Sequence, residues 1–190
     1  MSLFAYIIIA IALALNILIA LRPCAERFPI RLTRGLVLSL LVAVVYAGFL
    51  WLGISLGNII RYDSPIEEGL YDDVNQLVFI GLIILVAVKI MFPVLRKKHQ
   101  EVPIFDISRW GIVLLLAIAT GVNAFLIGLA FGFVQSIEGQ FWKATVPMMV
   151  TVFLLAYLAI MMGRQKKTLK ERRWTLLSAL MLLVAIFFQL

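Results

Sequence analysis

Residues 110–134 read WGIVLLLAIATGVNAFLIGLAFGFV and contain no charged side chain. A helix rises about 1.5 Å per residue, so about 20 apolar residues are enough to cross the hydrocarbon core of a bilayer. The apolar run is continuous, whereas a strand of a membrane β-barrel would alternate apolar and polar residues. This stretch is therefore predicted to be a transmembrane helix.

Five more apolar runs flank it, and the composition of the whole chain agrees with them. The 190 residues are 64% hydrophobic, with a mean hydropathy of +1.08, whereas a soluble domain is nearer half apolar. A fold in water would leave much of this apolar surface unburied. We predict an all-α membrane protein whose six transmembrane helices cover approximately residues 3–21, 35–60, 76–95, 110–134, 145–163 and 174–190.

The net charge of +7 is explained by membrane topology rather than by a nucleic-acid partner. The basic residues concentrate in the first, third and fifth connections, whereas the second connection is acidic. Positively charged connections stay on the cytoplasmic side, so both termini are expected outside. The basic residues of the three odd connections are Arg22, Arg27, Arg31, Arg34, Arg96, Lys97, Lys98, Arg109, Arg164, Lys166, Lys167, Lys170, Arg172 and Arg173.

Three helices in each half place a duplicated half upside down relative to the first. The expected organisation is a first repeat over 1–95, a basic connection over 96–109 and a second repeat over 110–190. A short internal match supports it, because the same Ala-Ile-Ala triplet precedes Asn16 and Asn123 at the same spacing. The fold class is therefore six transmembrane helices arranged as two inverted three-helix repeats.

Polar residues at membrane depth are the candidates for a binding site, because they are costly there unless they face a partner or a cavity. Asn16 and Asn123 either line a substrate site or bond to each other and hold the halves together. Thr120 lies one turn before Asn123. Lys89 is the one basic residue within a predicted span, and it either extends towards the cytoplasmic surface or faces a cavity.

Small residues spaced by one helical turn predict close helix packing. They lie in the second and fourth predicted helices, and the contacts are either within one chain or between the chains of a homodimer. The residues are Gly53, Gly57, Ala124, Gly128 and Gly132.

No set of residues supports an enzyme. All acidic residues fall in loops or at helix margins, and there is no glycine-rich phosphate loop, zinc motif or paired nucleophile and base. The single cysteine, Cys24, excludes an intrachain disulfide and a cysteine metal cluster. We expect no cofactor and no catalytic residue.

The stretch from Ala117 to Phe133, AIATGVNAFLIGLAFGF, resembles the fourth-helix motif of the bacterial manganese efflux pump family, MntP. Leu13 to Ile17 and Val86 to Met91 resemble motifs in its first and third helices. The resemblance implies six helices in inverted halves, the bacterial plasma (inner) membrane, and membership of the broader LysE-like exporter group. It also implies that Asn16 and Asn123 stand where the family has aspartates, and that Tyr46 stands where it has an acidic or amide residue.

These differences weaken metal binding, since hard divalent cations prefer anionic oxygen ligands and an asparagine neither neutralises charge nor titrates. Asn16 and Asn123 remain weak candidates for metal ligands. The chain is interpreted as a transporter resembling manganese efflux pumps, with Asn16, Asn123, Tyr46, Lys89 and Thr120 at its substrate site. Its substrate would be a small neutral, zwitterionic or anionic solute, or a divalent cation. The alternative is a non-transporting accessory or scaffold subunit of a membrane protein complex, in which Asn16 and Asn123 bond directly.

Overall fold

The computed structural model describes residues 3–63, 71–95, 105–134, 137–165 and 171–187, and within these ranges it contains six α-helices and no strand. Each helix contains one of the six apolar runs identified from the sequence. The helices are α1 (Leu3–Arg27), α2 (Leu32–Asp63), α3 (Tyr71–Leu95), α4 (Trp110–Val134), α5 (Ile137–Arg164) and α6 (Glu171–Phe187).

Five of the helices in the described part of the chain are long and apolar enough to cross a membrane. Their apolar spans are Phe4–Arg27, Leu32–Arg61, Val74–Phe92, Trp110–Val134 and Trp142–Arg164. The apolar part of α6, Arg173–Ile186, is shorter, and the end of the predicted span 174–190 lies outside the described residues. The chain is therefore a multi-pass helical membrane protein.

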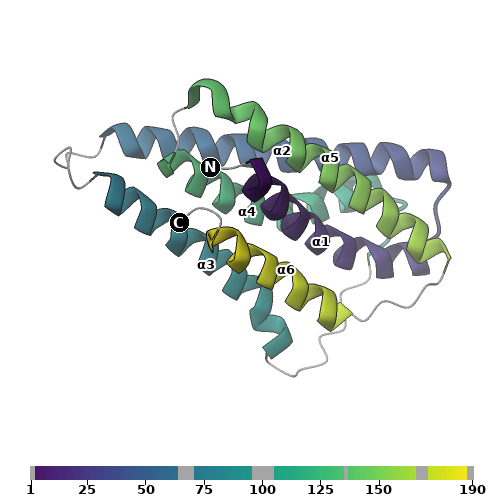
Figure 1. The fold of residues 1–190 in the computed structure, drawn as a ribbon. Helices are drawn as coiled ribbons and strands as arrows, with labels where there is room; N and C mark the ends of the chain where they lie inside the picture. Colours follow the sequence, from purple (N-terminus) through teal and green to yellow (C-terminus); the bar gives the residue numbers. More distant parts are fainter. Residues whose placement is uncertain (1–2, 64–70, 96–104, 135–136, 166–170, 188–190) are drawn as a thin grey trace.

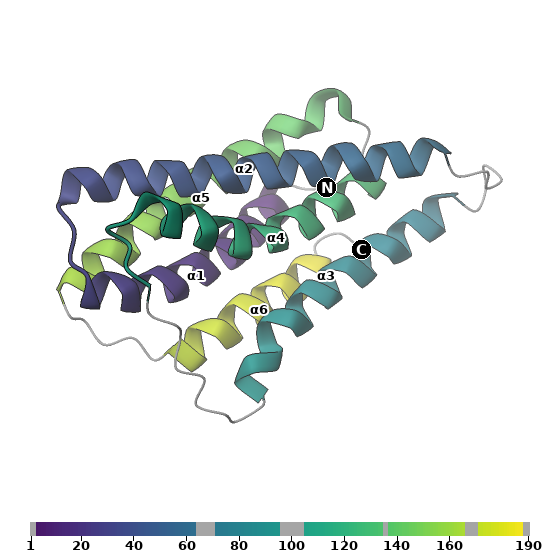
Figure 2. The same cartoon turned by 180° about the vertical axis from the view of Figure 1, so that it is seen from behind.

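The helices pack in three layers (Figures 1 and 2). The outer pair α2 and α5 covers the middle pair α4 and α1, and the pair α3 and α6 lies on the other side. Within these layers α4 packs on α2 and α3, while α1 packs on α5 and α6. The two middle helices contact each other only slightly, so each faces both outer layers.

Large apolar side chains cover the outside of the bundle as well as its core. Leu115 on α4 is 63% exposed and Leu180 on α6 is 60% exposed, and similar residues occur on every helix. Exposed apolar surface on this scale is not stable in water, but it matches the acyl chains of a bilayer. The lipid bilayer is the partner that this surface fits.

Several predicted spans are shorter than the helices that contain them. The first span was expected to end at residue 21, but α1 continues to Arg27. Arg22, expected in the first connection, is a buried residue of α1 whose guanidinium pairs with Glu26 at 2.9 Å. This pair one turn apart supports the helix beyond the apolar run. The second helix likewise extends past residue 60, to Asp63.

Parts of the predicted connections lie outside the described residues. These are residues 64–70 of the acidic second connection, 96–104 of the basic third connection with Arg96, Lys97 and Lys98, and most of the fifth connection with Lys166, Lys167 and Lys170. The α1–α2 junction lies at one end of the bundle, whereas α1 begins and α6 ends well short of the other end, beyond which α2 and α3 extend (Figures 1 and 2).

The segment before α4 docks on the first two helices. The Phe105 amide donates a hydrogen bond to the Cys24 Sγ at 3.4 Å, and Ile107 is fully buried. The Arg34 guanidinium donates to the Ser108 carbonyl and lies 5.5 Å from the ring centroid of Trp110. These contacts fix the start of α4 against α1 and α2.

A single carboxylate stabilises this docked turn. Hydrogen bonds from the Ser108 side chain and backbone, with help from Arg109 and Arg34, hold the pKa of Asp106 below its usual value. A carboxyl group with a lowered folded pKa stabilises the fold above its ordinary pKa, and this contribution is lost as the pH falls through the lowered value. We expect hydrogen-exchange protection of the Ser108 amide, corrected for intrinsic exchange, to fall between pH 7 and about pH 2, because the lowered pKa lies below the ordinary value of an aspartate.

The matched control is Asp106→Asn, which cannot titrate. In this variant the protection of Ser108 is expected to be low at both pH values and insensitive to the change. Equal protection at both pH values in the native chain would show that the Asp106 carboxylate does not hold the turn.

Candidate functional site

A hydrogen bond between α3 and α4 occupies the middle of the candidate site. The ammonium Nζ of Lys89 donates to Oδ1 of Asn123 at 2.8 Å. Asn123 is the fourteenth residue of the 25-residue helix α4, and therefore lies near its centre. The structure thus brings together two residues that the sequence marked separately.

The bond places the charge of Lys89 at membrane depth. Lys89 lies six residues before the end of α3 at Leu95, or about 9 Å along the helix axis. Side chains lean towards the N-terminus of their helix, so the lysine stem leans away from this nearer end. The ammonium is consequently held at the level of Asn123, and does not extend to the end of α3.

Asn16 occupies the equivalent place in α1. It is the fourteenth residue of a helix that also has 25 residues. Its Nδ2 is buried and makes no hydrogen bond. One turn earlier, the Ala12 carbonyl accepts a hydrogen bond from Ser178 of α6 at 2.7 Å. Asn16 therefore lies beside the α1–α6 contact, as Asn123 lies at the α4–α3 contact.

Asn16 and Asn123 do not bond to each other. The Asn123 Oδ1 accepts from Lys89, whereas the Asn16 Nδ2 makes no hydrogen bond, and their helices touch only slightly. The direct bond expected for an accessory or scaffold subunit is not formed.

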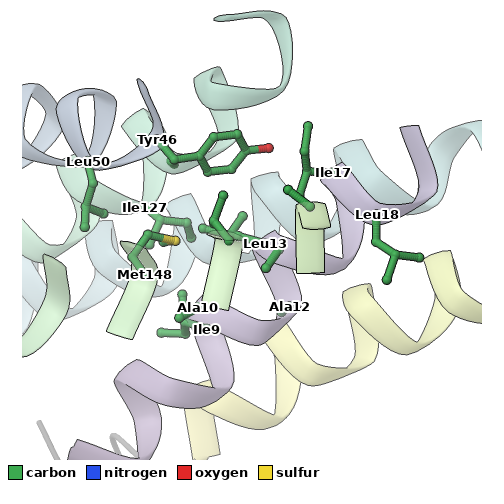
Figure 3. Packing of buried hydrophobic residues seen from close by; sticks show 14 of the residues in the cluster. Ile9, Ala10, Ala12, Leu13, Ile17, Leu18, Tyr46, Leu50, Ile127 and Met148 are labelled. Carbon is green, nitrogen blue, oxygen red and sulfur yellow. The ribbon is translucent and has the colours of Figure 1, made fainter. Parts of the chain in front are cut away.

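Tyr46 and Thr120 extend the polar set towards α2. Tyr46 is fully buried, and its hydroxyl is within reach of Thr120 but makes no hydrogen bond of normal geometry. Thr120 donates its own proton to the Leu116 carbonyl at 2.7 Å, so its lone pairs remain available. Figure 3 shows the Tyr46 hydroxyl directed towards Ile17, the neighbour of Asn16.

The glycines lie where α2 and α4 come closest. A Cβ built on Gly53 would lie 2.2 Å from the Phe125 carbonyl oxygen, and one on Gly128 would lie 2.2 Å from that of Leu50. A Cβ built on Gly57 or on Gly132 would likewise lie too close to backbone atoms of the facing helix. Ala124 is fully buried on the same helix. This backbone contact holds α4 in register with α2, and so fixes the height of Thr120 and Asn123.

The unpaired groups of the site include several hydrogen-bond donors. The Asn16 Nδ2 donates only, the Tyr46 hydroxyl can donate, and the Lys89 ammonium keeps two further N–H groups. A divalent cation needs acceptors instead. In a medium of effective dielectric constant about 20, a 2+ ion about 4 Å from an ammonium is repelled by about 8 kcal/mol. The described residues contain no cluster of three or more His, Cys, Asp or Glu side chains that could offset this.

Other buried polar groups were not identified from the sequence. Asn58 is 1% exposed and neither amide atom has a hydrogen-bond partner. Asn75 and Thr145 are also buried with an unpaired polar atom. Asn75 lies just before the predicted span 76–95 and Asn58 near the end of another, so both resembled residues of a helix margin. Asn75 lies inside the bundle because α3 begins at Tyr71, before the predicted span, whereas Asn58 already lay within the predicted span 35–60.

Together, the apolar helices and the polar residues at mid-helix define a multi-pass membrane protein with a polar centre. Residues 29–189 match the model of the MntP family, described as "Putative manganese efflux pump", and the chain belongs to this family. A comparison with curated proteins and one with solved structures each found no match. The family and the apolar helices together indicate a membrane efflux transporter.

Proposed function

We propose that the chain is an efflux transporter for a small solute, and that its substrate site lies where α1 and α4 face α3 and α6. The observation that carries the proposal is the Lys89–Asn123 hydrogen bond at the centre of α4. A charge kept at membrane depth costs free energy, and charged groups there commonly mark a transport pathway. Asn16, Tyr46 and Thr120 complete the site. The proposal involves no enzymatic reaction.

Two inverted repeats, 1–95 and 110–190, explain the arrangement of this site. The helices α1 and α4 have equal lengths, and each carries its asparagine at the same position. Exchanging the halves turns the α2–α4 contact into α5–α1 and the α3–α4 contact into α6–α1, and all four contacts are present. Such repeats support alternating access around a central site. In this proposal α6 crosses the membrane as the sixth span.

The basic odd-numbered connections support an orientation with both termini outside, in the inner membrane of a bacterium. The fold is proposed to be that of the LysE-like exporter group. The connection 96–109 would then link the repeats on the cytoplasmic side.

The native chain is not expected to export manganese. The ammonium of Lys89 occupies the Asn123 oxygen that would otherwise face a metal ion, and neither Asn16 nor Asn123 supplies negative charge. In this respect the chain is proposed to be a diverged member of its family.

Manganese sensitivity of an exporter-deficient bacterium tests whether the scaffold can transport. We expect no rescue by the native chain or by Asn16→Ala/Asn123→Ala. We expect rescue by Asn16→Asp/Asn123→Asp/Lys89→Gln, because this variant supplies two carboxylates and removes the competing ammonium. Membrane abundance of each variant is measured alongside growth.

Rescue by the native chain would contradict the expected loss of manganese export. Rescue by no variant, together with a partner protein that co-purifies in fixed ratio, would support an accessory or scaffold subunit. A homodimer would instead appear as twice the mass of one chain in detergent.

A further inference from the structure

We propose that a basic turn at the end of the bundle where α2 and α4 begin binds the headgroup of an anionic phospholipid. The residues of this basic turn are Arg31, Arg34, Arg109 and Trp110. None of them belongs to the proposed substrate site, so the inference does not depend on transport. It follows from the charge of the basic turn, from the hydrogen-bond donors that it keeps and from the apolar surface beside it.

Contacts between distant segments of the chain assemble the basic turn. The Arg34 guanidinium donates to the Ser108 carbonyl and lies 5.5 Å from the ring centroid of Trp110. The Arg109 Nε lies 3.6 Å from one carboxylate oxygen of Asp106, whose other oxygen accepts a hydrogen bond from the Ser108 amide. Figure 2 shows α4 beginning beside the first turns of α2. The arginines of the two segments therefore share one surface.

The basic turn carries an excess of positive charge. Arg31 immediately precedes α2, lies three residues before Arg34 and is exposed. Within the described part of the chain, the carboxylate that pairs with this group of arginines is that of Asp106. One carboxylate cannot balance three guanidinium groups. Basic residues next to a bilayer surface attract the headgroups of anionic lipids.

The guanidinium groups also keep donors for a phosphate group. A guanidinium has five N–H donors in a planar fork that matches the oxygens of a phosphate. Arg34 donates to the Ser108 carbonyl and retains further N–H groups. Arg31 forms no side-chain hydrogen bond or ion pair within the ranges that the structure describes. A phosphate oxygen can therefore accept hydrogen bonds from the basic turn without breaking an existing one.

The apolar surface beside the basic turn favours a lipid over a free phosphate ion. Trp110 is exposed and is the first residue of the apolar span of α4, a position at which tryptophan commonly marks the membrane interface. Leu114 and Leu115 on α4 are exposed one turn further along, as are Leu36 and Val37 on α2. A phospholipid can place its phosphate at the arginines and its acyl chains against these residues. A phosphate ion would use the charge alone.

Native mass spectrometry of the purified full chain tests this inference. The probes are phosphatidylglycerol, phosphatidylcholine with the same acyl chains, and inorganic phosphate. We expect the native chain to bind phosphatidylglycerol more tightly than phosphatidylcholine, and inorganic phosphate not to displace it. Arg31→Gln/Arg109→Gln should weaken phosphatidylglycerol binding at least about tenfold, because each arginine near an anionic lipid surface contributes about fivefold.

The matched control is Arg164→Gln/Arg173→Gln. It also removes two exposed arginines, where α5 ends and α6 begins, towards the same end of the bundle (Figure 1). Because these arginines lie outside the basic turn, phosphatidylglycerol binding should be unchanged. Equal binding of the two lipids, an equal loss in the control variant, or displacement by inorganic phosphate would each overturn the inference.

Tryptophan fluorescence gives a second test that needs no arginine variant. The native chain and Trp110→Phe are placed in phosphatidylcholine vesicles that contain a small fraction of brominated phosphatidylglycerol or brominated phosphatidylcholine. The share of quenching that Trp110→Phe removes is expected to be larger with the brominated phosphatidylglycerol. Equal shares with the two brominated lipids would show that no anionic lipid is preferred beside Trp110, and would also overturn the inference.

Discussion

Gly128→Val is expected to lower the free energy of unfolding of the chain strongly. The Cβ of any side chain at residue 128 would lie 2.2 Å from the Leu50 carbonyl oxygen, which belongs to the backbone of α2. A backbone atom cannot turn aside as a flexible side chain can, so α2 and α4 must separate. Overpacking of this kind typically costs about 1–3 kcal/mol, and a contact this short lies at the upper end of that range.

Thermal unfolding in detergent and recovery from size-exclusion chromatography measure this loss. Gly53→Val should behave similarly, because its Cβ would also meet α4 backbone at 2.2 Å. The matched control is Gly48→Val. Gly48 lies on α2, as Gly53 does, but a Cβ built there has nothing within 4 Å. If Gly128→Val is as stable as Gly48→Val, the close backbone contact between α2 and α4 is not present.

The membrane helices could be predicted because each signal is local. The fourth span, 110–134, coincides with α4, since its apolar run is bounded by charged or polar segments. The first and second spans were too short, because a helix continues beyond the hydrocarbon core when its polar residues find partners. Arg22 does so with Glu26, one turn further along α1.

The partners of the site residues could not be predicted, because they are separated by long stretches of sequence. Lys89 and Asn123 were each identified from their type and depth. Their pairing depends on how α3 lies against α4, and apolar helices carry no strong pattern that specifies a neighbour. The sequence alone also left open a contact between Asn16 and Asn123, which the structure does not contain.

The glycines illustrate the same division between local and distant information. The spacing of Gly53 and Gly57, and of Gly128 and Gly132, indicates that each helix has a face suited to close packing. The glycine spacing does not indicate which helix packs against that face. The structure places the two pairs against each other, which is a property of the fold and not of either helix.

The second large loss of stability is expected for substitutions at Lys89 and Asn123. Asn123→Leu removes the acceptor and leaves an ammonium at membrane depth without its partner. Truncating one side of such a pair is expected to cost about 2–3 kcal/mol of the free energy of unfolding. Lys89→Met removes the charge and leaves a neutral amide unpaired, which is expected to cost about 1–2 kcal/mol. Replacing both with apolar groups should cost less than the sum of the two changes.

A double-mutant cycle over Lys89→Met and Asn123→Leu therefore tests the central claim that Asn123 holds the lysine charge within the membrane. The measurement is the free energy of unfolding of the native chain, both single variants and the double variant in the same detergent. The 2.8 Å bond predicts a coupling energy of about 1.5–3 kcal/mol between the two residues. Changes that add to within about 0.5 kcal/mol would show that the two side chains do not interact, and would contradict the account of the site.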